Sequence, residues 1–161
     1  EDPKLLPQRC RLLRNDGNAN FLDISRGGGR FFQRELVTRG LSAADYDQDG
    51  RMDVAIVLHS GEGTLLRNTS KNTGNWLQVK LEGTDSNRFG IGARIQVTTA
   101  SNTYTRQCVL SSSYLSSNSM VWHFGLGDAE IAESVTVSWP AGGATEQKSV
   151  KLNQRITIQE K

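Results

Sequence analysis

The sequence is short of several residue types that mark particular classes of protein. It holds three prolines, two cysteines and two histidines among 161 residues, and aromatic residues make up 7%. No stretch approaches the roughly 20 consecutive apolar residues of a membrane-spanning helix, so we expect no membrane insertion. Nineteen Lys and Arg residues face seventeen Asp and Glu residues, which leaves a net charge of +2. Because positive and negative charges nearly cancel, the sequence argues against nucleic acid or an anionic membrane surface as the partner.

Helix signals are also missing, because good helix formers never gather into a long amphipathic stretch. Short alternating runs separated by Gly, Asn and Asp replace them, and this pattern is typical of strands and tight turns. We therefore predict an all-β protein, in which an antiparallel β-sandwich or barrel follows about one propeller-blade-like repeat. The strands expected in the sandwich span residues 76–81, 91–99, 103–110, 121–124, 134–139, 145–152 and 155–159. Nearer the N-terminus we expect a strand at 31–37, and the continuously apolar run 54–58 predicts a strand buried on both faces.

The two cysteines, Cys10 and Cys108, lie too far apart in the sequence for a zinc motif. Either they are ordinary buried thiols, or they form a disulfide that joins the N-terminal segment to the rest of the chain. We predict the disulfide, which in the chain-entropy model contributes about 4–5 kcal/mol for a loop of this length.

The clearest chemical signal is an acidic loop at residues 45–53, which reads Asp-Tyr-Asp-Gln-Asp-Gly-Arg-Met-Asp. Carboxylates this close together repel one another, and oxygen ligands at alternating positions suit Ca²⁺. We predict a calcium site in which Asp45, Asp47 and Asp49 supply side chains, Arg51 its backbone carbonyl and Asp53 a closing carboxylate. An EF-hand is excluded, because Ile56 stands at the twelfth position where a bidentate Glu is required. The alternative is a solvated acidic turn without an ion.

An internal repeat precedes and follows this loop. Arg-Leu-Leu-Arg-Asn at residues 11–15 and Thr-Leu-Leu-Arg-Asn at residues 64–68 agree at four of five positions. Their offset of 53 residues is close to the period of a propeller blade, which is about 40–50 residues. From residue 76 on, longer alternating strands follow, so we divide the chain into an extended arm (1–9), a repeat (10–72) and a β domain (73–161).

The residues resemble two known families. Leu-Leu-Arg-Asn-Asp-Gly at 12–17, followed by the acidic loop, is similar to an FG-GAP/VCBS repeat, the calcium-binding blade unit of integrin-like β-propellers. The remainder resembles an ASPIC/UnbV domain, on the segments 75–77, 86–94, 123–127 and 137–142. The two follow in the order found in the cartilage acidic protein family and its bacterial relatives.

This resemblance implies a secreted or cell-surface calcium-binding protein that takes part in adhesion and is not an enzyme. Its partners would be proteins or glycans at the cell surface. An unfinished blade also exposes strand edges, so we hypothesise self-association by strand addition into oligomers or filaments. Asn68, in the triplet Asn-Thr-Ser, is a candidate glycosylation site.

Two alternatives stay open. The first is a carbohydrate-binding accessory module, for which Tyr114 in the Ser-rich segment 111–119 is a candidate contact. The second is the C-terminal piece of a larger integrin-like propeller protein. His123 precedes the glycine-containing segment 124–127, and we assign it to packing because no nucleophile motif surrounds it.

Overall fold

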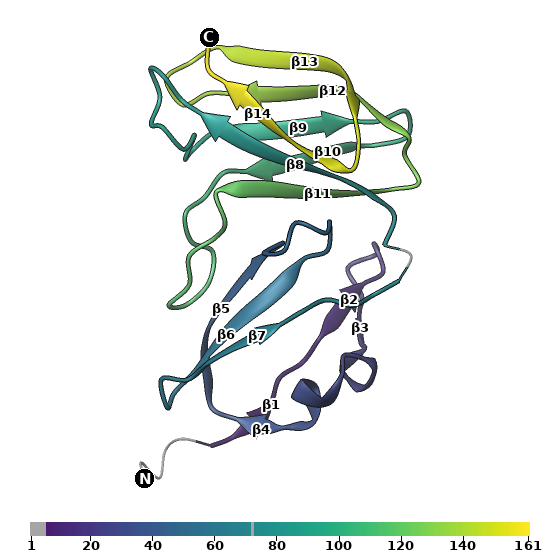
Figure 1. The fold of residues 1–161 in the computed structure, drawn as a ribbon, viewed down its shortest axis with the longest axis vertical. Helices are drawn as coiled ribbons and strands as arrows, with labels where there is room; N and C mark the ends of the chain where they lie inside the picture. Colours follow the sequence, from purple (N-terminus) through teal and green to yellow (C-terminus); the bar gives the residue numbers. More distant parts are fainter. Residues whose placement is uncertain (1–5, 72) are drawn as a thin grey trace. The chain divides into compact units, whose positions relative to one another are not determined.

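The structure is a computed structural model that describes residues 6–71 and 73–161 (Figure 1). Over these residues the chain is all-β, and its only helical segments are two short 3₁₀ turns. The elements in chain order are β1 (Gln8–Arg9), β2 (Leu13–Asn15), β3 (Phe21–Asp23), η1 (Ser25–Gly27), η2 (Arg30–Gln33), β4 (Glu35–Leu36), β5 (Thr38–Ala44), β6 (Asp53–Leu58), β7 (Gly63–Leu66), β8 (Asn75–Glu82), β9 (Arg94–Thr98), β10 (Thr103–Gln107), β11 (Val121–Gly127), β12 (Ile131–Ser138), β13 (Ala144–Lys151) and β14 (Gln154–Gln159).

The seven strands β8 to β14 form a sandwich of two sheets, called here the C-terminal sandwich. One sheet has the order β10-β9-β12-β13 and the other β11-β8-β14 (Figure 1). The sheets do not close into a barrel, and the predicted all-β sandwich is confirmed. One pairing differs from the antiparallel expectation, since β14 runs parallel to β8. Parallel neighbours need a long connection, and here the intervening strands of the domain provide it.

The core of the sandwich lies between these two sheets. Alternate residues of β8 point inward, and Leu77, Val79 and Leu81 are each at most 2% exposed. The facing sheet contributes Ile95 and Val97 to the same apolar cluster. Each such side chain stabilises the fold by about 1.5–3 kcal/mol, so burial accounts for the strand alternation read from the sequence.

A buried carboxylate ties the end of the chain to this sandwich. Glu160 is 6% exposed, and it accepts hydrogen bonds from the backbone N–H groups of Thr84 (2.8 Å) and Ser86 (2.7 Å) and from Ser86 Oγ (2.5 Å). Burial raises its pKa, but the hydrogen bonds from Ser86 and Thr84 outweigh burial and leave the pKa below the usual value. Glu160 therefore holds the turn after β8 as a carboxylate.

The remaining strands form smaller sheets, with the orders β5-β6-β7, β2-β3 and β1-β4. Contacts divide the chain into two compact units, and the division does not follow the linear order of the sequence. One unit holds the described residues through Gly40 together with Ile56–Thr64; the other holds Leu41–Ala55 and Leu65–Lys161. The acidic loop thus belongs to the same unit as the C-terminal sandwich, and this shared unit is the setting of the candidate site. Residues 1–5 of the predicted arm, and residue 72 at the predicted domain boundary, lie outside the described residues.

Two local predictions are wrong. The run 54–58 was expected to be buried on both faces, yet in β6 burial alternates, and Val57 is 48% exposed while Ile56 is 4% exposed. A continuously apolar run indicates a strand that can be buried, but it does not show whether other elements pack against one face or both. The strand predicted at 31–37 is instead split into η2 and the two-residue β4, with Phe31 buried.

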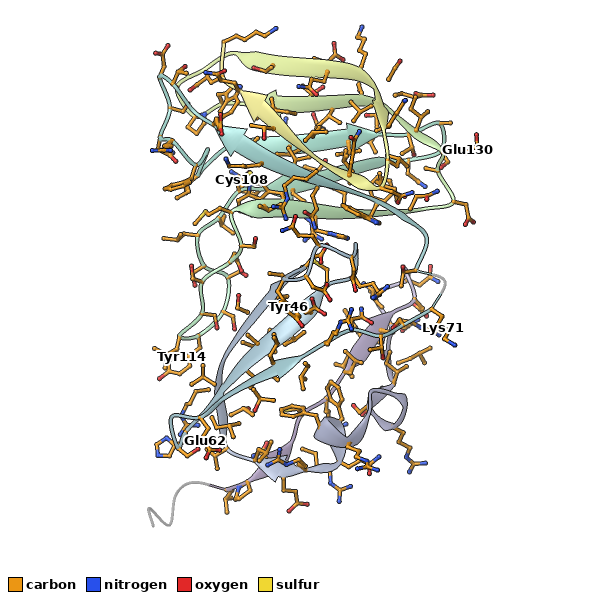
Figure 2. All side chains as sticks on the ribbon, viewed as in Figure 1. Tyr46, Glu62, Lys71, Cys108, Tyr114 and Glu130 are labelled. Atoms are coloured by element: carbon orange, nitrogen blue, oxygen red, sulfur yellow. The ribbon has the colours of Figure 1, made fainter. Side chains whose placement is uncertain are left out.

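Cys10 and Cys108 are both free thiols in the structure, and the disulfide between them stays a prediction. Cys108 is 0% exposed within the core cluster of the sandwich (labelled in Figure 2), whereas Cys10 belongs to the other unit. Burial raises the pKa of the Cys108 thiol to about 12, so the reactive thiolate is scarce at neutral pH. The alternative reading of a buried structural thiol therefore fits Cys108.

Candidate metal centre

The acidic loop connects β5 to β6 and is closed on itself by hydrogen bonds. The carboxylate of Asp45 accepts from the backbone N–H of Asp49 (3.0 Å) and of Gly50 (2.9 Å). Gly50 has φ +86°, in the left-handed region that glycine enters without steric cost. The sequence Asp-Gly at this point therefore produces a tight turn that wraps around the first aspartate.

This turn brings three carboxylates together. One oxygen atom from each of Asp45, Asp47 and Asp49 lies within 4.8 Å of the others. Calcium binds oxygen at 2.3–2.6 Å, so two oxygens on one ion are at most about 5 Å apart. The spacing of the three oxygens thus fits a single Ca²⁺, and carboxylate oxygen is the ligand type that calcium prefers.

Two arginines offset the charge of this cluster. Arg67 Nε donates to Asp47 Oδ2 (2.8 Å), and a second nitrogen of Arg67 lies 3.4 Å from Asp49. Arg51 also pairs with Asp49. The hydrogen bond and the charge of Asp47 raise the pKa of Arg67 above its usual value. A cation entering the cluster would therefore compete with two guanidinium groups for Asp47 and Asp49.

The two other predicted ligands occupy different positions. Asp53 is 2% exposed, and its two oxygens accept from the backbone N–H groups of Asn68 (2.7 Å) and Tyr46 (3.2 Å). It lies outside the group of three converging carboxylates. The side chain of Arg51 donates from Nε to the carbonyl oxygen of Asn68 (2.8 Å). In this structure Asp53 and Arg51 thus tie the loop to the segment after β7.

Residues of the C-terminal sandwich also reach the loop. Gln78 Nε2 donates to Asp45 Oδ2 (2.7 Å), and the indole of Trp76 lies directly against Gly50. His123 stacks on Trp76 with ring centroids 5.9 Å apart. Burial lowers the pKa of His123, while the nearby charge of Asp45 opposes that shift. This stacking is compatible with the predicted role of His123 in packing, which stays a prediction.

Sequence reasoning missed Gln78 and Arg67. In the alternating strand 76–81 Gln78 reads as an ordinary outward polar residue, and no local signal marks it as buried. Arg67 did carry a signal, because it is one of the repeated positions shared with residues 11–15. The contacts of Arg67 with Asp47 and Asp49 become visible only in the tertiary structure.

The other candidate residues lie on the surface or near it. Asn68 Oδ1 accepts from the backbone N–H of Ser70 (3.0 Å) in a local turn, and its glycosylation stays a prediction. Tyr114 is 69% exposed in the loop 111–119 (labelled in Figure 2), where serine hydroxyls hydrogen-bond to neighbouring carbonyl groups.

Comparison with known families supports half of the resemblance. Residues 83–161 match the family described as ASPIC and UnbV, which supports the ASPIC/UnbV resemblance over this range. No curated protein matches the chain. Within the described residues, the structure holds no helix that is long and apolar enough to cross a membrane. The FG-GAP/VCBS resemblance of residues 10–72 stays a prediction.

Proposed function

We propose that this chain is a calcium-binding, non-enzymatic protein that acts in adhesion or assembly outside the cell, with Ca²⁺ stabilising its fold. The observation that carries the proposal is the convergence of Asp45, Asp47 and Asp49 on one point. These ligands are all hard oxygen donors, which favour Ca²⁺ over a transition metal. Mg²⁺ is less suited, because it demands octahedral geometry and retains several waters.

Electrostatics explains why an ion would stabilise the fold. Three carboxylates repel one another at this spacing, and Arg51 and Arg67 offset only part of that charge. A divalent cation bound to the folded loop, and not to the unfolded chain, stabilises the protein by mass action. The extracellular and non-catalytic parts of the proposal rest on the resemblance to FG-GAP/VCBS and ASPIC/UnbV proteins.

Calcium titration of the chelator-treated protein tests this function. We expect CaCl₂ to raise the melting temperature in a saturable way, and MgCl₂ at equal concentration to raise it less. Asp47→Asn should remove most of the calcium effect, since Asp47 is an exposed member of the cluster. Asp128→Asn, an exposed aspartate outside the cluster, is the matched control and should respond like the wild type. A melting temperature that ignores calcium in the wild type contradicts the proposal.

One observation supports assembly in particular. The ribbon of β2 and β3 leaves apolar side chains in solvent, with Leu13 50%, Phe21 59% and Leu22 49% exposed. Ile24 N donates to Leu12 O and Asp16 N donates to Asn20 O, so the backbone groups of Leu13 and Asn15 point to the opposite edge of β2. A two-stranded ribbon is marginally stable alone, and such an edge recruits further strands.

Sedimentation velocity at increasing protein concentration tests assembly. We expect concentration-dependent oligomers with calcium present, and Phe21→Ser should reduce them because it removes exposed apolar surface from the ribbon. Tyr114→Ser is the matched control, since Tyr114 is also an exposed aromatic residue but lies in another loop. A monodisperse monomer at all concentrations contradicts self-association and leaves the calcium proposal standing.

A further inference from the structure

The strand under the acidic loop carries a row of polar side chains. Gln78 occupies the middle strand of the sheet β11-β8-β14, and its register partners are His123 on β11 and Arg155 on β14. Residues directly opposite one another on paired strands point to the same face, so these three side chains share one face of the sheet. The neighbouring residues Leu77 and Val79 point to the core and are 0% exposed.

Gln78 is buried although it lies on the face opposite the core. It is 2% exposed, and both ends of its amide have charged partners. Arg155 Nε donates to Gln78 Oε1 (2.8 Å), and Gln78 Nε2 donates to Asp45 Oδ2 (2.7 Å). The amide thus connects a guanidinium to a carboxylate, and each hydrogen bond polarises the group so that the next one is stronger.

The Asp45 carboxylate accepts three hydrogen bonds in all. Asp49 N, Gly50 N and Gln78 Nε2 all donate to its carboxylate, and Gln78 is the one that comes from outside the loop. The two loop donors fix the turn, while Gln78 fixes the carboxylate relative to the sheet. The close contact of Trp76 with Gly50 provides a second attachment of the loop to the same face.

We propose that Gln78 is the positioning residue of the acidic loop, through which the C-terminal sandwich orders Asp45 and sets the cation affinity of the cluster. The cation part of this inference rests on the proposed function; the ordering of the loop does not. A side chain that orients a metal ligand without touching the metal commonly changes metal affinity by about 10- to 100-fold when it is replaced. By linkage, a cation bound at the loop stabilises β8 and its neighbours.

The test replaces Gln78 in the full chain by methionine, which has a similar size and no hydrogen-bonding amide. We expect calcium affinity, measured by isothermal titration calorimetry, to fall at least about tenfold. In the chelated protein, hydrogen exchange at the amides of Asp49 and Gly50 should accelerate at least about tenfold, because Asp45 is no longer held. Gln96→Met, a half-buried glutamine on β9 of the other sheet, is the matched control and should change neither measurement.

A second substitution separates positioning from simple charge attraction. Gln78→Glu keeps the acceptor for Arg155 but removes the donor to Asp45, while it adds a negative charge near the cluster. Charge attraction alone would tighten calcium binding, whereas loss of positioning weakens it. Arg155→Met removes the exposed partner of Gln78 without touching the buried side chain, so it covers the case in which Gln78→Met fails to fold. For Arg155→Met we expect changes in the same direction but smaller.

The outcomes are distinct. Unchanged affinity and unchanged exchange in Gln78→Met, or tighter binding in Gln78→Glu, overturn the inference. If Gln78→Met does not fold, unchanged exchange in Arg155→Met overturns it as well. A wild-type protein that binds no calcium, combined with faster exchange at Asp49 and Gly50 in Gln78→Met, contradicts the proposed function and supports the positioning role.

Discussion

Replacing Gly50 by alanine probes the contact between the acidic loop and the sheet beneath it. Gly50 has φ +86°, and a Cβ built there would lie 2.0 Å from Trp76 Nε1 and 2.5 Å from Trp76 Cδ1. The left-handed conformation costs an alanine about 1–2 kcal/mol. Overlap with a rigid indole adds about 1–3 kcal/mol, as overpacking does in protein cores. The sum is a destabilisation of about 2–5 kcal/mol.

The matched control is Gly143→Ala. Gly143 has φ +76° in the same unit, and a Cβ there meets no atom within 4 Å. It therefore carries the conformational cost alone, about 1–2 kcal/mol. Equilibrium urea unfolding followed by circular dichroism, with chelator and with calcium, measures both values. In a thermal melt the difference between the two variants corresponds to about 2–4 °C per kcal/mol for a chain of this size.

A Gly50→Ala variant no less stable than Gly143→Ala would refute the reasoning, since it would mean that the loop does not rest on Trp76. A double-mutant cycle with Trp76→Leu strengthens the test. If the overlap is the cause, removing the indole should abolish most of the extra cost at Gly50 and leave only the conformational part.

Three further predictions concern titratable groups. Because the folded-state pKa of Glu160 is lowered, its contribution to stability is present above pH 4.5 and is lost as pH falls below that value. In melts at several pH values, Glu160→Gln should therefore reduce the loss of melting temperature at acidic pH. The pKa of His123 is lowered as well, so the wild type should lose stability as pH falls below 6.5, and equal slopes in wild type and His123→Phe would contradict this. With Ellman's reagent we expect Cys10 to react in the native protein and Cys108 only after unfolding, whereas a disulfide would give no free thiol.

The fold was largely predictable because its strands follow a local rule. Each of the seven strands expected in the C-terminal half exists, and their alternation reflects one buried face, as at Leu77 and Val79. The parallel pairing of β14 with β8 was not predictable, since pairing depends on residues far apart in the sequence. The number of covered faces of β6 escaped prediction for the same reason, as the exposure of Val57 demonstrates.

The candidate site divides in the same way. Spacing along the chain was enough to indicate that Asp45, Asp47 and Asp49 converge, because a turn at Asp-Gly brings alternate residues together. Asp53 has the same chemistry, yet it lies outside the converging group and accepts the backbone N–H groups of Tyr46 in the loop and of Asn68 after β7. Which carboxylates converge is therefore decided by where the tertiary structure places each side chain.

The sequence alone determined the strand-rich character of the chain and the acidic turn, since both arise from interactions among residues a few positions apart. The tertiary structure alone decided that Gln78 and Arg155 support that turn. Gln78 lies 33 positions after Asp45 and 77 before Arg155. Contacts over such separations leave no periodic trace in a single sequence, because they depend on how strands pair and not on how residues alternate.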